Sequence, residues 1–159
     1  MASLVAPSLD TFLGKPIKDI CTVGYDDGAQ NHCAHFVSHA LEIKNGILCG
    51  DMKFDTRHQG TTIKVHELFN SLSQRGPWEE SPKGASSLLV FVTSAKNVSN
   101  NRMSNVPQKH VGIYLNGGVY NYSNTRHQVV LDASLDIFHD KFKKTYHGKD
   151  ISLYYGVIA

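Results

Sequence analysis

The chain has 159 residues, of which 41% are hydrophobic and 19% are charged. This composition suits one globular domain with its own apolar core and excludes a disordered chain. The formal net charge of +2 is too small to indicate binding to nucleic acid. No apolar run approaches the roughly 20 residues that span a bilayer, so we expect no membrane partner. The sequence therefore predicts a single domain over residues 1–159 and a monomer.

The N-terminus and the cysteines indicate the cellular compartment. The stretch MASLVAPSLDTFLGKP contains neither a basic segment nor a long apolar segment, so we expect synthesis in the cytoplasm without a signal peptide. Three cysteines without regular spacing, Cys21, Cys33 and Cys49, argue against a disulfide framework. Cys21 and Cys49 could still pair with each other, and the sequence leaves this alternative open.

Two amphipathic helices are expected in the first half of the chain. Residues 21–32 are rich in Gly, Asp and Asn and indicate a loop. Asn31 is well placed as the N-cap of the first helix, and Gly46 would end that helix. The apolar faces of the two helices consist of Cys33, Phe36, Val37, Ala40 and Leu41, and of Val65, Leu68, Phe69 and Leu72.

The second half of the chain is dominated by strand patterns. Residues 93–108 are rich in Ser and Asn and indicate an exposed loop, whereas 134–145 form a polar segment of helical character. Asn116-Gly117-Gly118 is a strong hairpin signal. The expected strands cover residues 88–92, 110–115, 119–123, 128–132 and 151–158. The order of elements predicts an α+β fold in which N-terminal helices pack on an antiparallel sheet.

Cys33 is the candidate nucleophile because it opens a helix. An unperturbed thiol is only about 3% ionised at pH 7. The helix N-terminus supplies at most ~2 kcal/mol toward the thiolate, whereas lowering the pKa by three units needs about 4 kcal/mol. We therefore expect a nearby imidazolium to complete the activation, while backbone N–H groups of the same helix end could form an oxyanion hole.

His110 is the candidate base because it heads a predicted core strand and is therefore held on a rigid element. Asn121 is the candidate group that orients the imidazole. With a two-residue turn in the hairpin, Asn121 opposes Gly112 or Tyr114, and both of these share a face with His110. A three-residue loop would turn Asn121 to the other face.

Four stretches together resemble the NlpC/P60 cysteine peptidase family. NHCAHFVSHAL at 31–41 is similar to that family's nucleophile helix, D-C-S-G-F-V-x-x-x-L. KGASSLLVF at 83–91 resembles its PGDLVFF strand, and HVGIYL at 110–115 matches its HVGIYLG strand. GVYNYS at 118–123 lies where the family has GxMIHAS, which puts Asn121 at the third catalytic position. The order and spacing of the four stretches agree as well.

The resemblance implies a papain-like fold and hydrolysis of an amide bond in peptidoglycan stem peptides, through an acyl-enzyme at Cys33 and without a cofactor. Tyr25 looks like the tyrosine that some members place beside the nucleophile. Tyr25, Asn31 and His32 are therefore the candidates for substrate binding and the oxyanion hole. The small size is similar to amidase effectors of type VI secretion systems, which implies export to the periplasm of a target cell and a cognate immunity protein.

Several positions depart from the family pattern. His32 stands where the family has Asp, Ala34 where it has Ser and His35 where it has Gly, and these positions are expected to line the substrate side. Asn121 replaces the usual third His. Two other functions therefore stay open: a thiol acyltransferase or deamidase on the same fold, and a non-catalytic binding module that retains a degenerate site.

The histidines also permit a metal hypothesis. His35 and His39 are spaced i, i+4, which suits two ligands on one helix, with His32, His58 or His66 as further ligands. No H-E-x-x-H motif or zinc-type cysteine pair accompanies them. The pattern is better explained by a solvated polar face of the helix, so the sequence predicts no metal.

Overall fold

The computed structural model describes residues 6–53, 57–148 and 150–158. Its centre is a six-stranded sheet in which every neighbouring pair of strands is antiparallel. In spatial order the strands are β1 (Arg75–Pro77), β8 (Ile151–Gly156), β2 (Ser87–Ser94), β5 (Lys109–Leu115), β6 (Gly118–Ser123) and β7 (Gln128–Asp132). The C-terminal strand β8 thus lies between β1 and β2, whereas β7, the strand before it in the sequence, forms the opposite edge of the sheet.

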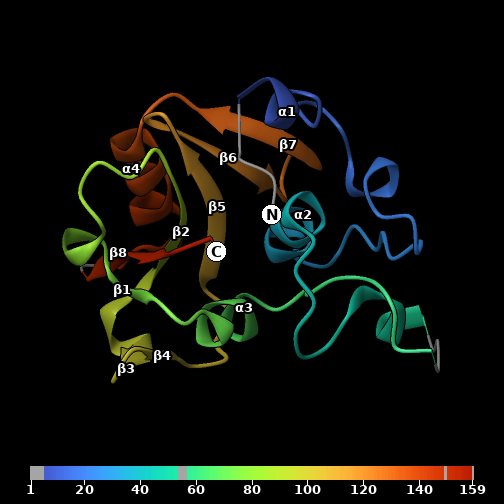
Figure 1. Cartoon of the computed structure of the whole chain (residues 1–159), viewed down its shortest axis with the longest axis horizontal. Coiled ribbons are helices and arrows are strands. Elements are labelled where there is room, and N and C mark those ends of the chain that lie inside the picture. Colours follow the sequence, from blue (N-terminus) through green and yellow to red (C-terminus); the bar gives the residue numbers. More distant parts are fainter. Residues whose placement is uncertain (1–5, 54–56, 149, 159) are drawn as a thin grey trace.

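Helices cover both faces of this sheet (Figure 1). The α-helices within the described residues are α1 (Ala6–Asp10), α2 (Cys33–Leu41), α3 (Val65–Ser71) and α4 (Leu135–Tyr146). Short 3-10 helices lie at η1 (Ile17–Asp19), η2 (Cys49–Lys53), η3 (Trp78–Glu80) and η4 (Ala95–Asn97). A small separate hairpin pairs β3 (Val98–Ser99) with β4 (Arg102–Met103).

The central strand β2 shows why two apolar layers form. Six consecutive residues of this strand are buried, so neither face of it meets water. Leu89 and Phe91 join the larger apolar cluster, which includes residues of α2 and α3. Val90 and Val92 point to the other side, where they pack against Phe138 of α4 and its neighbours. The alternation of side chains along one strand therefore holds helices on both sides of the sheet.

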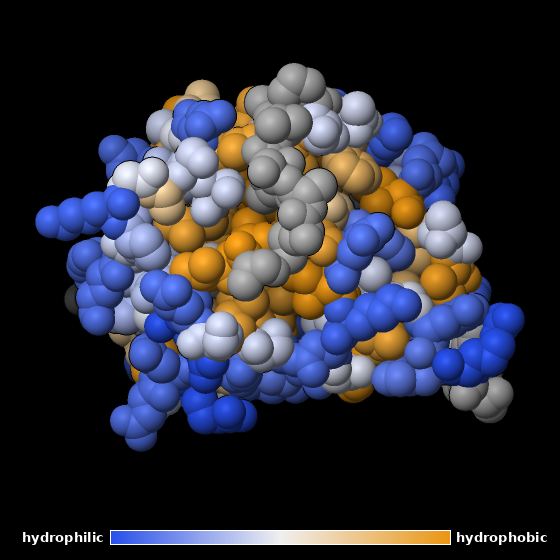
Figure 2. All heavy atoms as spheres, viewed as in Figure 1, coloured by the Kyte–Doolittle hydropathy of each residue, from blue (hydrophilic) through white to orange (hydrophobic). Residues whose placement is uncertain are grey.

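On the face viewed in Figure 2, apolar side chains gather toward the middle and hydrophilic residues surround them. Within the described residues, none of the helices combines the length and the apolar character needed to cross a membrane.

The predicted α+β class and the antiparallel sheet are confirmed, whereas some element ends and several short elements differ from the prediction. The first amphipathic helix has its N-cap at His32 rather than Asn31, and it ends at Leu41, not at Gly46. Glu42 follows that end in the left-handed conformation and supplies the C-cap. The segment expected as an exposed loop at 93–108 contains η4 and the β3–β4 hairpin. Strand β1 was not predicted because three residues carry no readable periodicity.

The hairpin between β5 and β6 has the predicted two-residue turn. Asn116 and Gly117 both have positive φ, 50° and 92°, as a turn of this type requires. Gly112 consequently opposes Asn121 across the pair. This register brings Asn121 to the same face of the sheet as His110.

Gly112 has no side chain, and this allows β6 to approach β5 closely at this position. A Cβ atom at this position would lie 2.7 Å from Val119 Cγ1 and 2.9 Å from the Tyr120 carbonyl oxygen. We expect Gly112→Ala to lower the free energy of unfolding by about 1–3 kcal/mol, because β6 must shift to accept the methyl group. Urea unfolding measures this loss. Gly28→Ala is the matched control, since its Cβ would come no closer than 3.7 Å to a neighbour, and an equal loss in both variants would contradict the explanation.

Candidate active site at Cys33, His110 and Asn121

His110 and Asn121 form a buried hydrogen-bonded pair. His110 is 3% exposed and Asn121 is fully buried, and 3.1 Å separates His110 Nε2 from Asn121 Oδ1. The amide of Asn121 is oriented by its Nδ2, which donates to Val119 O at 3.2 Å and to Asp132 Oδ2 at 3.0 Å. Because Oδ1 can only accept, His110 Nε2 donates to it, and a neutral imidazole then has its free lone pair on Nδ1. That tautomer is the one a general base requires.

Two further residues, Asp132 and Lys141, extend this hydrogen-bonded pair, and sequence reasoning missed both of them. Lys141 of α4 lies 2.6 Å from Asp132 Oδ2 and 3.4 Å from Asn121 Oδ1. Asp132 ends β7, and its side chain is 13% exposed. Asp132 therefore fixes the amide that in turn fixes the imidazole. The sequence pointed to neither residue, because the Asp132 contact depends on the register between β6 and β7 and the Lys141 contact depends on α4 crossing the sheet.

The surroundings of His110 are aromatic. Its ring stacks on Phe142 with centroids 4.4 Å apart and planes inclined by 30°, and Phe138 lies 6.1 Å away. Burial lowers the pKa of His110 to about 3, although the hydrogen bond with Asn121 opposes the shift. The imidazole is therefore neutral at physiological pH.

Cys33 lies beside the start of β5. Its backbone N–H donates to Asn31 Oδ1 at 2.9 Å, and the Val111 backbone hydrogen-bonds to the thiol. Lys109 also interacts with this thiol electrostatically, so both neighbours of His110 in the strand interact with Cys33. Among the described residues, no hydrogen bond joins the Cys33 sulfur directly to the His110 ring. The structure thus brings the candidate nucleophile to the strand that carries the candidate base, without a direct contact between the two side chains.

The ionisation state differs from the expectation of a thiolate activated by an imidazolium. Cys33 is 1% exposed, and burial raises the pKa of its thiol to about 11 despite the hydrogen bonds that favour the thiolate. Desolvation therefore exceeds what the end of α2 supplies. The resting dyad consists of a neutral thiol and a neutral imidazole.

The three residues expected for substrate binding and the oxyanion hole lie close together but in different surroundings. Tyr25 is buried, and its ring centroid lies 5.3 Å from that of His32. Asn31 is exposed, and its Oδ1 accepts from Cys33 N–H and from Asn124 Nδ2. His32 is 1% exposed, so it does not line an open substrate surface. The backbone N–H groups of His32 and Cys33 both donate to asparagine oxygens, which occupies the donors expected to form the oxyanion hole.

Two cavities flank the candidate site. One has a volume of about 300 Å³ and is lined by His110, Asn121, Lys141 and Tyr146 among others. The other has a volume of about 400 Å³, and its lining includes Tyr25, Lys64 and Lys109. Asn31 and Pro107 line both cavities. The two cavities therefore adjoin at the residue that hydrogen-bonds the Cys33 backbone.

The polar face of α2 is not solvated as expected. His32 and His35 are at most 1% exposed, and His39 is half-buried. Neither His58 nor His66 joins His35 and His39; instead, the thiols of Cys21 and Cys49 do. These two cysteines are free, with their sulfur atoms 3.7 Å apart. Sequence spacing could not reveal this group because Cys21 and Cys49 come from separate segments before and after α2 in the chain.

Comparisons of the chain with protein-family models, curated proteins and solved structures found no match.

Proposed function

We propose that this protein is a cysteine-dependent hydrolase of papain-like, NlpC/P60-type fold that cleaves an amide bond in peptidoglycan stem peptides. The observation that supports this most is the buried His110–Asn121 pair, whose polarity leaves Nδ1 of His110 as the proton acceptor. Cys33 lies against the residues that flank His110. Nucleophile, base and orienting amide thus occur in the order and on the elements that this chemistry uses.

The catalytic sequence begins with closure of the dyad. Substrate binding displaces residues that cover Cys33, and His110 Nδ1 takes the thiol proton as the sulfur attacks the amide carbonyl carbon. The tetrahedral intermediate collapses, the C–N bond breaks, and His110 returns the proton to the leaving amine. A water molecule, deprotonated by His110, then hydrolyses the thioester and regenerates the thiol. Catalytic contacts that are open in a free enzyme commonly close only when substrate is bound.

The charges around the cavities support an acidic peptide as substrate. Lys64 and Lys109 line the 400 Å³ cavity, whereas the charge of Lys141 beside His110 is paired with Asp132. Stem peptides carry free carboxylates, which such side chains attract. An exported antibacterial effector acting in the periplasm, together with a cognate immunity protein, is the biological setting we propose.

Digestion of purified peptidoglycan fragments tests the proposal. We expect the wild-type protein to produce new fragments whose masses include one added water per cleaved bond. Cys33→Ala should yield none, because alanine offers no nucleophile. Ile137→Ala is the matched control, because Ile137 is 51% exposed and the loss of its side chain should leave the fold unchanged. Cys49→Ala is unsuitable as a control because Cys49 is fully buried. Identical products from wild type and Cys33→Ala would refute the proposal.

A binding module with a degenerate site is the second candidate, and the burial of Cys33 without a direct contact to His110 favours it. In the same experiment this candidate predicts retention of unmodified fragments by the protein. An acyltransferase would instead leave an acyl group on an acceptor, and a deamidase would convert a side-chain amide to an acid without cutting the chain. The fragment masses separate these outcomes.

A further inference from the structure

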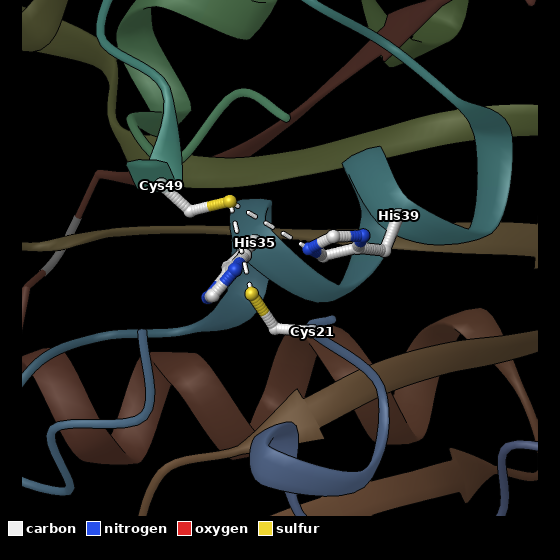
Figure 3. A group of neighbouring side chains, drawn as sticks. All are labelled: Cys21, His35, His39 and Cys49. Carbon is white, nitrogen blue, oxygen red and sulfur yellow. Dashed lines mark hydrogen bonds between the residues drawn. The ribbon is translucent and has the colours of Figure 1, made fainter. Parts of the chain in front are cut away.

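Four side chains outside the proposed catalytic group converge on one point. Cys21, His35, His39 and Cys49 each offer one ligand atom, and these atoms all lie within 4.8 Å of one another. Figure 3 shows the four side chains pointing toward a common centre from three segments. Cys21 follows η1, the two histidines lie one turn apart on α2, and Cys49 begins η2.

The distances within this group match those around a tetrahedral metal ion. With zinc bonds of about 2.3 Å to sulfur and about 2.0 Å to nitrogen, two thiolates lie about 3.8 Å apart and a thiolate lies about 3.6 Å from an imidazole nitrogen. The observed separations are 3.7 Å between the Cys21 and Cys49 sulfur atoms and 3.8 Å between Cys49 Sγ and His39 Nε2. A disulfide needs sulfur atoms about 2.0 Å apart and would leave both histidines without a partner.

A relay of hydrogen bonds sets the tautomer of His35. His32 Nε2 lies 2.6 Å from the Asp27 carbonyl oxygen, which can only accept, so His32 donates from Nε2. Its Nδ1 then accepts from His35 Nδ1, 3.0 Å away. In that tautomer His35 Nε2 carries a lone pair, and it is a buried atom without a hydrogen-bond partner. Metal-binding histidines are held in this way, with the second ring nitrogen donating to a fixed acceptor.

The backbone around Cys49 packs closely against its sulfur atom and supplies a hydrogen-bond donor to it. The Thr61 backbone N–H donates to Cys49 Sγ at 3.4 Å. Gly60 adopts φ +106°, and a Cβ there would lie 2.3 Å from this sulfur. Such N–H···S contacts stabilise a thiolate in the same manner as other outer-shell hydrogen bonds around metal ligands.

We infer that Cys21, His35, His39 and Cys49 bind a structural Zn²⁺ ion. Two thiols and two imidazoles are a common zinc ligand set, and the His35–His39 spacing is the H-x₃-H of such sites. Two thiolates neutralise the ion, which makes the buried complex uncharged. Binding replaces two thiol protons, which are released to solvent. No electron transfer is involved.

Four protein ligands leave no open coordination position, so the ion would fasten the fold and would not act on substrate. It would join the loop before Tyr25 and the segment at Cys49 to α2, the helix that begins at Cys33. Loss of the ion should therefore loosen both segments around the nucleophile helix. This inference is independent of the reaction proposed above.

Metal analysis of the full chain, purified under reducing conditions, tests the inference. We expect one zinc per chain with a dissociation constant of about 10⁻⁸ M or tighter. Cys49→Ser and Cys21→Ser should each weaken binding at least about 100-fold, because they remove a ligand where even outer-shell changes cost 10–100-fold. Cys33→Ser is the matched control, since it removes the remaining cysteine from outside the group, and it should retain the zinc.

Co²⁺ substitution provides a readout that does not require a folded variant. The wild-type protein loaded with Co²⁺ should show the intense visible bands of a tetrahedral ion and thiolate-to-cobalt charge transfer in the near ultraviolet. A chelator should lower the midpoint of thermal unfolding. Three results of the metal experiments would overturn the inference: reduced wild type that binds neither metal, a Co²⁺ spectrum without thiolate charge transfer, or a Cys33→Ser variant that loses zinc as the other variants do. Thiol titration that finds Cys21 and Cys49 joined in a disulfide in the purified chain would also overturn it.

Discussion

Replacing His110 with glutamine should lower kcat for cleavage of peptidoglycan fragments by about 10²–10⁴-fold, the usual contribution of a positioned general base. A glutamine amide can still donate to Asn121 Oδ1 in place of the imidazole Nε2–H, so the buried hydrogen bond persists. What disappears is the lone pair that accepts the Cys33 proton. Single-turnover measurements with the same fragments separate this loss from an effect on binding, because KM should change little.

His127→Asn is the matched control for this variant. His127 is exposed in the turn between β6 and β7, and its φ of 55° suits asparagine. This control should keep wild-type kcat. A His110→Gln variant that cleaves at the wild-type rate would remove His110 from the mechanism.

Acid should destabilise this protein through the same residue. The pKa of His110 is about 3 in the folded chain and about 6.5 when unfolded, so between these values only the unfolded state binds the proton. The free energy of unfolding therefore falls as pH decreases, by about 1.4 kcal/mol per pH unit for this group. The contribution is complete above pH 6.5 and is lost progressively toward pH 3.

Urea unfolding at pH 6.5 and pH 4.5 measures the effect. Wild type should lose about 2 kcal/mol more than His110→Gln between these two pH values, because half of the unfolded chains already bind the proton at pH 6.5. Burial also lowers the pKa of His35 and of His66, but both residues are present in both proteins, so their contributions cancel in the comparison. Equal losses in the two proteins would show that His110 is accessible to protons in the folded state.

Local sequence patterns were sufficient for the elements that carry the candidate site. The apolar spacing after Cys33 predicted α2, and the alternation from His110 predicted β5. The hairpin signal limited the partner of Asn121 to Gly112 or Tyr114, both on the face of His110, and the structure selects Gly112. These features depend only on residues close together in the chain, which is why periodicity and turn chemistry could specify them.

The surroundings of those residues were decided by the tertiary structure. Lys141 reaches Asn121 only because α4 crosses the sheet beside β7, whereas Asp132 reaches it through the pairing of β7 with β6. The spacing of His35 and His39 suggested a pair of ligands, but their partners Cys21 and Cys49 come from segments that the sequence alone could not bring together. Periodicity assigns a residue to one side of a helix without saying what covers that side, so both histidines were wrongly assigned to solvent.

The protonation states of Cys33 and His110 were likewise decided by the tertiary structure and not by the sequence alone. The sequence pointed to Cys33 as the proposed nucleophile and His110 as the proposed base, because such a proposal depends on residue type and on the element that carries it. It did not determine that Cys33 and His110 would both be neutral at rest, with pKa values of about 11 and about 3. Those values depend on how much solvent each group loses when α2, α4 and the loops pack around the sheet, and desolvation is a property of the whole fold.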